Sequence, residues 1–204
     1  KYAIWDRGRD RPGGVFREEA LPSEKDSGSP APKTGSPPAA PPATQWVQTE
    51  WWVDPYADAV HQYNIDLARE IQALGVDEIQ FDYIRFPSDG NTASILCRFH
   101  RDEKGAIIRD ESSGRTRVQA LSAFLRKARQ ALTIPIGTDV FGFNGWARMS
   151  YLGQDIQEFS FYVDVISPMM YPSHYARNFL GDLNYFERAS YIYEMETMRS
   201  RIIT

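Results

Sequence analysis

The chain of 204 residues has little cysteine, little histidine and no long hydrophobic run, and each shortage excludes a class of protein. Its one cysteine, Cys97, cannot form an intramolecular disulfide, so the fold is not a small disulfide-stapled scaffold. Because no run of about 18 apolar residues occurs, we expect no membrane-spanning helix. Metal sites need clustered ligands, whereas the three histidines are scattered at His61, His100 and His174. We therefore expect no metal and no other cofactor.

Positive charge is also scarce, because 23 Lys and Arg residues stand against 27 Asp and Glu residues and leave a net charge of −4. No stripe of basic residues stands out, so we expect no nucleic-acid partner. Aromatic residues, by contrast, make up 13% of the chain. Most of them must pack in the core, but large amphipathic rings also make platforms for sugars. The composition is therefore compatible with a carbohydrate partner.

A stretch of low complexity interrupts the first quarter of the chain. Residues 21–44 hold most of the prolines and are otherwise rich in Ser, Gly, Ala and Thr. This composition cannot bury a hydrophobic core. We expect a disordered insertion at about residues 17–45, within a single domain that spans residues 1–204.

Four amphipathic segments have the spacing of helices. The first is expected to begin at Asp54–Pro55, where an N-cap residue precedes Pro at the first helical position, and to stop at Gly75. We expect His61 to lie on its surface. Its expected buried row is Val60, Tyr63, Leu67, Ile71 and Leu74. The other three helices are expected at about residues 117–132, 154–161 and 187–202.

Four short apolar segments have the composition of strands and alternate with these helices. They lie at residues 2–5, 77–86, 136–142 and 163–171. Alternating strands and helices indicate an α/β fold with a parallel sheet. A complete (β/α)8 barrel has eight strands and about 250 residues. The chain is therefore either a small open sheet or the middle of a barrel whose ends are missing. The strand at its start and the helix at its end favour the fragment.

The strand at residues 77–86 has two unlike faces, because side chains alternate along a strand. Ile79, Phe81 and Tyr83 are expected to pack under helices. Gln80 and Asp82 lie on the opposite face. Such a polar row is typical of a closed parallel barrel, in which the row ends at an active site at the carboxyl ends of the strands.

Polar side chains end several of the expected strands at this same edge. They are Asp6, Asp82, Arg85, Asp139, Tyr171 and His174. Two carboxylates on either side of a sugar can hydrolyse a glycosidic bond, one as acid and the other as nucleophile or base. Asp82 and Asp139 are the candidate catalytic pair, with retaining and inverting outcomes both open. In the plainer alternative, Asp82 forms an ion pair with Arg85 and Asp139 caps a helix.

The sequence also resembles a known family in several blocks that occur in the family's order. The blocks are Tyr2–Asp6, Trp52–Tyr56, Asp77–Gly90, Thr138–Gly142, Gly153–Asp155 and Ser167–Tyr175. They resemble a family of bacterial glycoside-hydrolase domains, distantly similar to alpha-amylase-like barrels. The resemblance covers nearly the whole chain apart from residues 17–45.

This resemblance implies a partial TIM (β/α)8 barrel that contains roughly strands three to six. It implies glycosidase chemistry, with Asp82 as nucleophile and Asp139 as acid and base, but it indicates no substrate. We expect the substrate to be a polysaccharide. The resemblance also favours a secreted or cell-envelope location. The residues expected to bind substrate are Asp6, Gln80, Arg85, Trp146, Tyr171, His174 and Tyr175.

A second interpretation is a carbohydrate-binding barrel without catalytic activity. The acids would then only form hydrogen bonds to the sugar. The rings of the sugar would stack on Trp51, Trp52, Trp146 and Tyr171.

Overall fold

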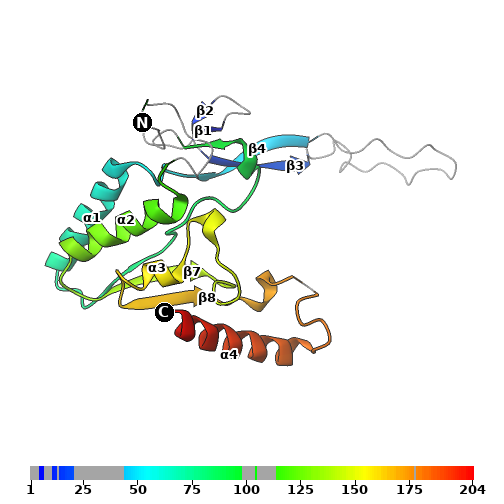
Figure 1. The fold of residues 1–204 in the computed structure, drawn as a ribbon. Helices are drawn as coiled ribbons and strands as arrows, with labels where there is room; N and C mark the ends of the chain where they lie inside the picture. Colours follow the sequence, from blue (N-terminus) through cyan, green and yellow to red (C-terminus); the bar gives the residue numbers. More distant parts are fainter. Residues whose placement is uncertain are drawn as a thin grey trace.

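The computed structural model of the chain describes residues 5–6, 11–12, 14–20, 44–97, 104, 114–176 and 178–204. A parallel sheet of three strands lies at its centre, with helices packed against it (Figure 1). The strands are, in spatial order, β5 (Ile79–Phe81), β7 (Ile136–Phe141) and β8 (Val165–Met169). The helices are α1 (Asp58–Ala73), α2 (Arg117–Ala131), α3 (Ile156–Phe159) and α4 (Tyr185–Ile203). The α/β class is confirmed, whereas the barrel remains a prediction.

One face of the parallel sheet forms the hydrophobic core with α1, α2 and α3. Ile79, Ile136 and Val140 of the strands are buried among side chains of these helices. The ring of Phe81 packs edge-on against Phe124 of α2, with centroids 5.0 Å apart. The alternation expected for the strand at residues 77–86 is thus confirmed from Ile79 to Phe81. The opposite face carries the exposed Gln80 and the half-buried Asp139.

The strand that precedes Asp82 is shorter than expected and ends at Phe81. Immediately after it, the backbone amide of Tyr83 donates to Asp82 Oδ1 at 2.6 Å, and Tyr83 takes a φ of 55°. This local bond competes with the strand's hydrogen bonds and turns the chain. The prediction that Tyr83 packs under the helices is therefore wrong, because its ring is exposed.

The first expected strand does not join the parallel sheet. β1 (Trp5–Asp6) instead pairs antiparallel with β2 (Arg11–Pro12) and with β6 (Ile95–Leu96), which follows the short 3-10 helix η1 (Thr92–Ser94). A strand of two residues is too short to bury a row of apolar side chains. The sequence of residues 2–5 therefore does not indicate which strand pairs with β1.

The ends of the expected insertion are ordered as a third sheet. β3 (Gly14–Ala20) pairs antiparallel with β4 (Thr44–Trp51), which corrects the expected limits of residues 17–45. Residues 21–43 lie outside the described residues.

Helix α1 buries a different stripe from the one expected. His61, Ile65 and Ala68 face the core, whereas the expected row remains largely exposed. Helix α2 lies beside α1 (Figure 1), and its Phe124 packs against His61 of this stripe. Helical spacing admits more than one apolar stripe, and contact with α2 decides which one is buried.

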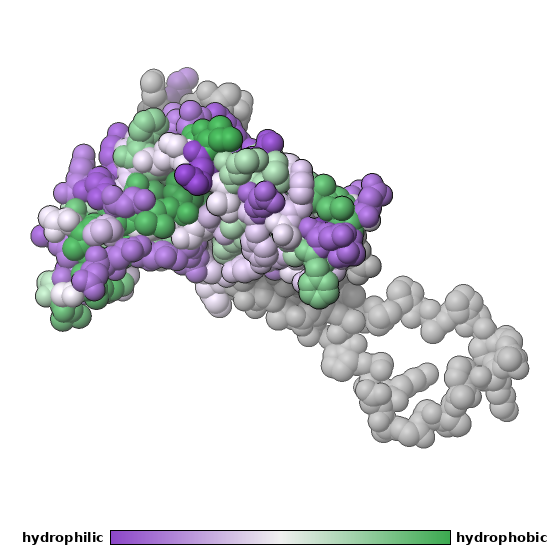
Figure 2. Space-filling view, turned by 90° about the horizontal axis from the view of Figure 1, so that it is seen from below, coloured by the Kyte–Doolittle hydropathy of each residue, from purple (hydrophilic) through white to green (hydrophobic). Residues whose placement is uncertain are grey.

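Apolar side chains remain on the surface in several places. Figure 2 shows hydrophobic patches between hydrophilic residues on the side seen from below. The large exposed residues include Tyr63, Leu67, Ile71 and Leu74 of α1, Val165 of β8, and Phe186 and Ile202 of α4. Among the described helices, none is both long and apolar enough to cross a membrane.

Helix ends follow local capping chemistry. Asp54 does not cap α1, because its Oδ1 accepts from the backbone amide of Tyr56 at 3.0 Å in the preceding turn. Helix α2 has a capping box between Thr116 and Gln119, and α4 has one between Asn184 and Glu187. Such reciprocal bonds satisfy backbone amides that have no partner inside the helix.

Gly153 closes the turn between α3 and the 3-10 helix η3 (Ser150–Leu152), and alanine there is expected to destabilise the fold. Its φ is +79°, and an added Cβ would lie 2.7 Å from Leu121 Cδ1 and 2.9 Å from Phe86 Cδ2. Gly75→Ala is the matched control, since Gly75 has a φ of +90° but no atom within 4 Å. Urea unfolding should show Gly153→Ala to be about 1–3 kcal/mol less stable than Gly75→Ala. Equal free energies of unfolding for the two variants would show that the side chains of Leu121 and Phe86 move aside without an energetic cost.

Candidate functional site

A pocket of about 540 Å³ opens at the carboxyl end of β5. Its walls come from the segment before α1, from the N-terminal halves of α1 and α2, and from the end of β5 and the turn after it. They include Trp51, Trp52, Val60, His61, Asn64, Phe81, Asp82, Tyr83, Arg85, Leu121 and Phe124. The carboxyl ends of parallel strands are where α/β proteins bind ligands. This pocket is therefore the candidate functional site.

Asp82 supplies a carboxylate to the pocket. It is the first residue after β5, and its side chain is exposed. One oxygen accepts the hydrogen bond from the Tyr83 amide. Because the turn at Tyr83 begins at Asp82, the geometry that ends the strand also holds this carboxylate at the strand's end.

Arg85 lies in the same wall between aromatic rings. Its guanidinium carbon is 4.8 Å from the ring centroid of Trp52, 4.8 Å from that of Tyr83 and 5.0 Å from that of Phe141. Nη1 donates to Ser88 Oγ at 3.0 Å. Cation–π contacts of this kind stabilise a charge that is largely removed from water.

Asp82 and Arg85 form no ion pair with each other among the described residues, and Asp139 lies within β7 instead of at a helix cap. The plainer alternative for these three side chains is therefore wrong.

His61 lies in the floor of the pocket, so the expectation of a surface histidine is wrong. The ring is buried against Phe124, with centroids 5.5 Å apart. Its Nε2 donates to the carbonyl oxygen of Pro55 at 2.7 Å, which leaves Nδ1 as the unprotonated nitrogen of the neutral ring. Burial lowers the pKa of His61, so the imidazole is neutral near pH 7.

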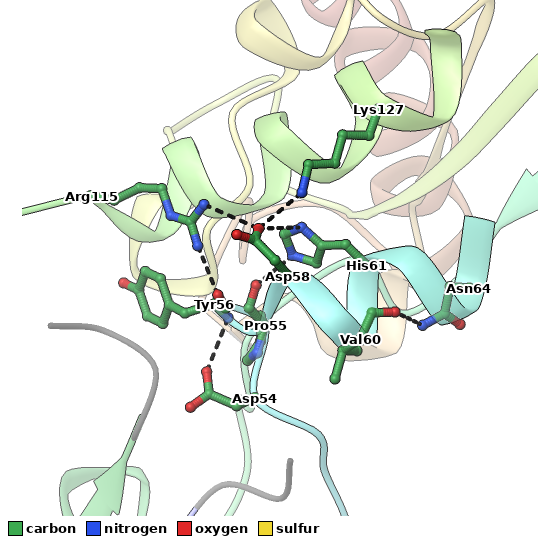
Figure 3. Close-up of polar contacts among 9 residues, drawn as sticks. All are labelled: Asp54, Pro55, Tyr56, Asp58, Val60, His61, Asn64, Arg115 and Lys127. Atoms are coloured by element: carbon green, nitrogen blue, oxygen red, sulfur yellow. Dashed lines mark hydrogen bonds and ion pairs between the residues drawn. The ribbon is translucent and has the colours of Figure 1, made fainter. Parts of the chain in front are cut away.

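Next to His61, the carboxylate of Asp58 forms ion pairs with Arg115 and Lys127 (Figure 3). Asp58 Oδ1 lies 2.9 Å from Lys127 Nζ and 3.8 Å from Arg115 Nη1. The hydrogen bond from Lys127 is the main cause that lowers the pKa of Asp58. Arg115 also donates to the carbonyl oxygen of Tyr56 at 2.8 Å. These contacts join α1 to α2 and to the segment before α2.

Asp139 lies on the open face of the sheet and is held by Gln80. Gln80 Nε2 donates to Asp139 Oδ1 at 2.6 Å. Gln80 pairs in register with Gly137, and Phe81 with Thr138, so Asp82 and Asp139 follow at matching positions on neighbouring strands. Asp139 is not among the residues that line the pocket. The structure thus groups Asp139 with Gln80, and Asp82 with Arg85.

Gln154 ties the ends of the two strands together. Its Oε1 accepts from the backbone amide of Phe141 at 2.9 Å, and its Nε2 donates to the carbonyl oxygen of Ile84 at 3.0 Å. The side chain is fully buried. From the sequence, Gln154 is expected at a helix start and within one of the blocks that resemble the family. Its link between the strand ends was not predicted, because contacts between distant loops leave no local pattern.

Trp146 and Tyr175 were expected to bind substrate, but they pack within the protein. Trp146 lies edge-on to Phe179 and under the guanidinium of Arg199. Tyr175 is buried, and its hydroxyl accepts from the backbone amide of Phe143 at 3.1 Å. These contacts connect the loop after β7 with the segment after β8. In this structure Trp146 and Tyr175 hold these two segments together and do not line the pocket.

Glu196 of α4 completes this connection from inside the protein. Oε1 accepts from the Gly145 amide at 2.8 Å, and Oε2 accepts from the Tyr175 hydroxyl at 3.4 Å. The side chain is fully buried, and burial is the main cause that raises the pKa of Glu196. Burial is also the main cause that raises the pKa of Tyr175. No local pattern in α4 distinguishes Glu196 from the exposed acids beside it.

Glu196→Gln is expected to flatten the dependence of stability on pH. Because the folded-state pKa of Glu196 lies above its ordinary value of 4.5, the wild type loses stability as pH rises from about 4.5 through the folded-state pKa. Glutamine keeps an oxygen that accepts from the Gly145 amide, and its NH2 group can donate to the Tyr175 oxygen in place of the bond that Glu196 accepts. It does not titrate. The free energy of unfolding of Glu196→Gln minus that of the wild type should therefore increase over this window in chemical denaturation. Glu194→Gln, at an exposed position of the same helix, should leave the wild-type profile unchanged. A constant difference between Glu196→Gln and wild type would contradict the assignment.

The remaining predicted residues lie apart from the pocket. Tyr171 and His174 follow β8, at and within the 3-10 helix η4 (Pro172–His174), and their ring centroids are 5.2 Å apart. Tyr171 is exposed, and His174 Nδ1 lies 3.2 Å from Ser173 Oγ. The side chain of Asp6 lies outside the described residues. No group of three or more His, Cys, Asp or Glu side chains in the described part of the chain is arranged to hold a metal ion.

One comparison with known proteins gives a match. A family model described as "Putative glycosyl hydrolase domain" matches residues 32–202. The matched range includes every predicted site residue except Asp6, and it includes all the walls of the pocket. Searches of curated proteins and of solved structures give no match.

Proposed function

Because the chain belongs to the family of putative glycosyl hydrolase domains, we propose that it hydrolyses glycosidic bonds of a polysaccharide with Asp82 and Asp139 as its two carboxylates. The observation that carries the proposal is the position of Asp82. It lies in a pocket with aromatic walls, at the carboxyl end of a parallel strand. We propose further that the sheet β5-β7-β8 is part of a (β/α)8 barrel, in which this edge is the catalytic one.

In this mechanism Asp82 attacks the anomeric carbon while Asp139 gives its proton to the departing glycosidic oxygen. Asp139 then takes a proton from water, and that water releases the sugar from Asp82. A retaining reaction of this kind needs the two carboxyl groups about 5–5.5 Å apart, whereas an inverting one needs about 6.5–9.5 Å. Gln80 supports the assignment because its amide fixes one oxygen of Asp139 and leaves the other for the substrate.

The second candidate is carbohydrate binding without cleavage. It is favoured by one specific observation, namely that Asp139 faces Gln80 and is absent from the walls of the pocket that contains Asp82. In that case the exposed Trp51 and Tyr83 would hold sugar rings, and Asp82 would accept hydrogen bonds from hydroxyl groups.

A polysaccharide panel distinguishes the two candidates. Neutral and acidic glycans are incubated with the protein, and newly formed reducing ends are measured beside affinity electrophoresis of the same glycans. We expect at least one glycan to be both bound and cleaved. Binding without cleavage would support the second candidate, and neither binding nor cleavage would contradict both.

A further inference from the structure

Arg85 is a buried cation without a carboxylate partner. Its side chain is only 6% exposed, although it lines the pocket. No ion pair reaches it from any described residue. Its hydrogen bonds go to neutral oxygens, those of Ser88 and of the Phe86 carbonyl. Taking a charge out of water is costly unless it is paired, so an isolated guanidinium in a pocket wall suggests that a ligand supplies the anion.

The geometry leaves one edge of the guanidinium for that anion. Three aromatic rings lie around its faces at about the same distance, and Nη1 is engaged with protein oxygens. Nε and Nη2 donate no hydrogen bond to a described residue. These two N–H groups are parallel in a guanidinium, and they match the two oxygens of a planar carboxylate.

The charges around the pocket favour a single negative charge on the ligand. Asp82 is the one carboxylate in the wall, and Arg85 is the one permanent cation. His61 is neutral because burial lowers its pKa, and Lys127 is engaged with Asp58. A dianion such as phosphate would bring its second charge into the same space as Asp82. A monoanion would pair with Arg85 and add only one negative charge to a wall in which Asp82 and Arg85 already offset each other.

We propose that this pocket binds a sugar acid, with the carboxylate of a uronic acid residue held by Nε and Nη2 of Arg85. The sugar ring would then lie beside Trp52 and Tyr83, whose ring centroids are 6.1 Å apart. The inference rests on the proposed function for its ligand class, and it narrows that class from polysaccharides in general to acidic ones.

The test compares acidic oligosaccharides with their carboxyl-reduced counterparts, which differ only in the charged group. Short oligomers of galacturonate, mannuronate and glucuronate-containing glycans are titrated by calorimetry. Because a hydrogen-bonded charge contributes about 1.5–3 kcal/mol, at least one acidic oligomer should bind about ten- to a hundredfold more tightly than its reduced form. The same titrations with Asp82→Asn exclude consumption of the ligand by hydrolysis.

Variants of Arg85 show where the preference arises. Arg85→Gln should remove it, and Arg85→Lys should retain only a small part, because lysine keeps the charge but loses the paired N–H groups. Arg126→Gln, at an exposed position of α2, should bind like the wild type. Circular dichroism checks that each variant is folded. If Arg85→Gln does not fold, the binding preferences of Arg85→Lys and of the wild type decide whether the proposal holds.

Several outcomes would overturn the proposal. They are equal binding of acidic and reduced oligomers, a preference that survives in both Arg85 variants, no binding of any acidic oligomer, or displacement by inorganic phosphate at equal concentration. Cleavage of neutral glycans alone would overturn this inference and leave the proposed glycosidase intact. An acidic preference without cleavage would support this inference and contradict the glycosidase.

Discussion

Replacing Asp82 with asparagine is expected to lower kcat/KM for the cleaved glycan by at least about 10²–10⁴-fold, because losing the nucleophile costs no less than losing a positioned acid or base. Asparagine has nearly the same shape and can still accept the hydrogen bond from Tyr83, so the turn after β5 should remain. What it loses is the charge that attacks or takes a proton. Binding of the same glycan should therefore change much less than its cleavage, and calorimetry beside initial rates would show the difference.

Two further carboxylates give this experiment its controls. Asp66→Asn removes an exposed charge on α1 that only accepts a bond from Gln62, so it should cleave at the wild-type rate. Asp139→Asn should reduce cleavage as Asp82→Asn does if both acids act on one bond. Wild-type rates for Asp82→Asn would exclude it as an essential group. A loss at Asp82 alone would remove Asp139 from the mechanism and leave its bond with Gln80 as its role.

Replacing Gln154 with leucine is expected to destabilise the fold by about 2–4 kcal/mol. The change removes the partners of the Phe141 amide and of the Ile84 carbonyl, and each buried polar group left unpaired costs about 1–3 kcal/mol. Leucine fills a similar volume, so the loss arises mainly from hydrogen bonding. The free energy of unfolding from urea titration measures the change directly.

Gln130→Leu is the matched control for Gln154, because Gln130 is exposed on α2. It should alter stability by less than about 0.5 kcal/mol, as surface substitutions usually do. Since Gln154 joins the segments after β5 and β7, its replacement should also weaken glycan binding in the pocket. A stability near that of the wild type would mean that other contacts hold the two strand ends together.

Much of the architecture was predictable from local patterns. The four amphipathic segments became α1 to α4, and three of the four apolar segments became parallel strands. The position of Asp82 at a strand end followed from the break after the apolar residues of β5. These features depend on neighbours a few positions apart, so the sequence records them directly.

The burial of individual polar residues was less predictable. His61 and Glu196 both lie on helices where nothing nearby in the sequence marks them as buried. Each is buried because a partner from a distant segment meets it, Phe124 for His61 and Gly145 for Glu196. A hydrophobic pattern shows which face can be buried, but the packing of other elements decides which face is.

By itself, the sequence determined the class of fold, the family and the position of Asp82 at the end of a strand. All three depend on local composition and on blocks of residues in a fixed order. Only the tertiary structure decided which groups share a site. It placed Asp82 with Arg85 and three aromatic rings, and it placed Asp139 with Gln80. The turn at Tyr83 is the physical reason, since β5 ends at Phe81 and the alternation of the strand therefore no longer decides where the side chains after it lie.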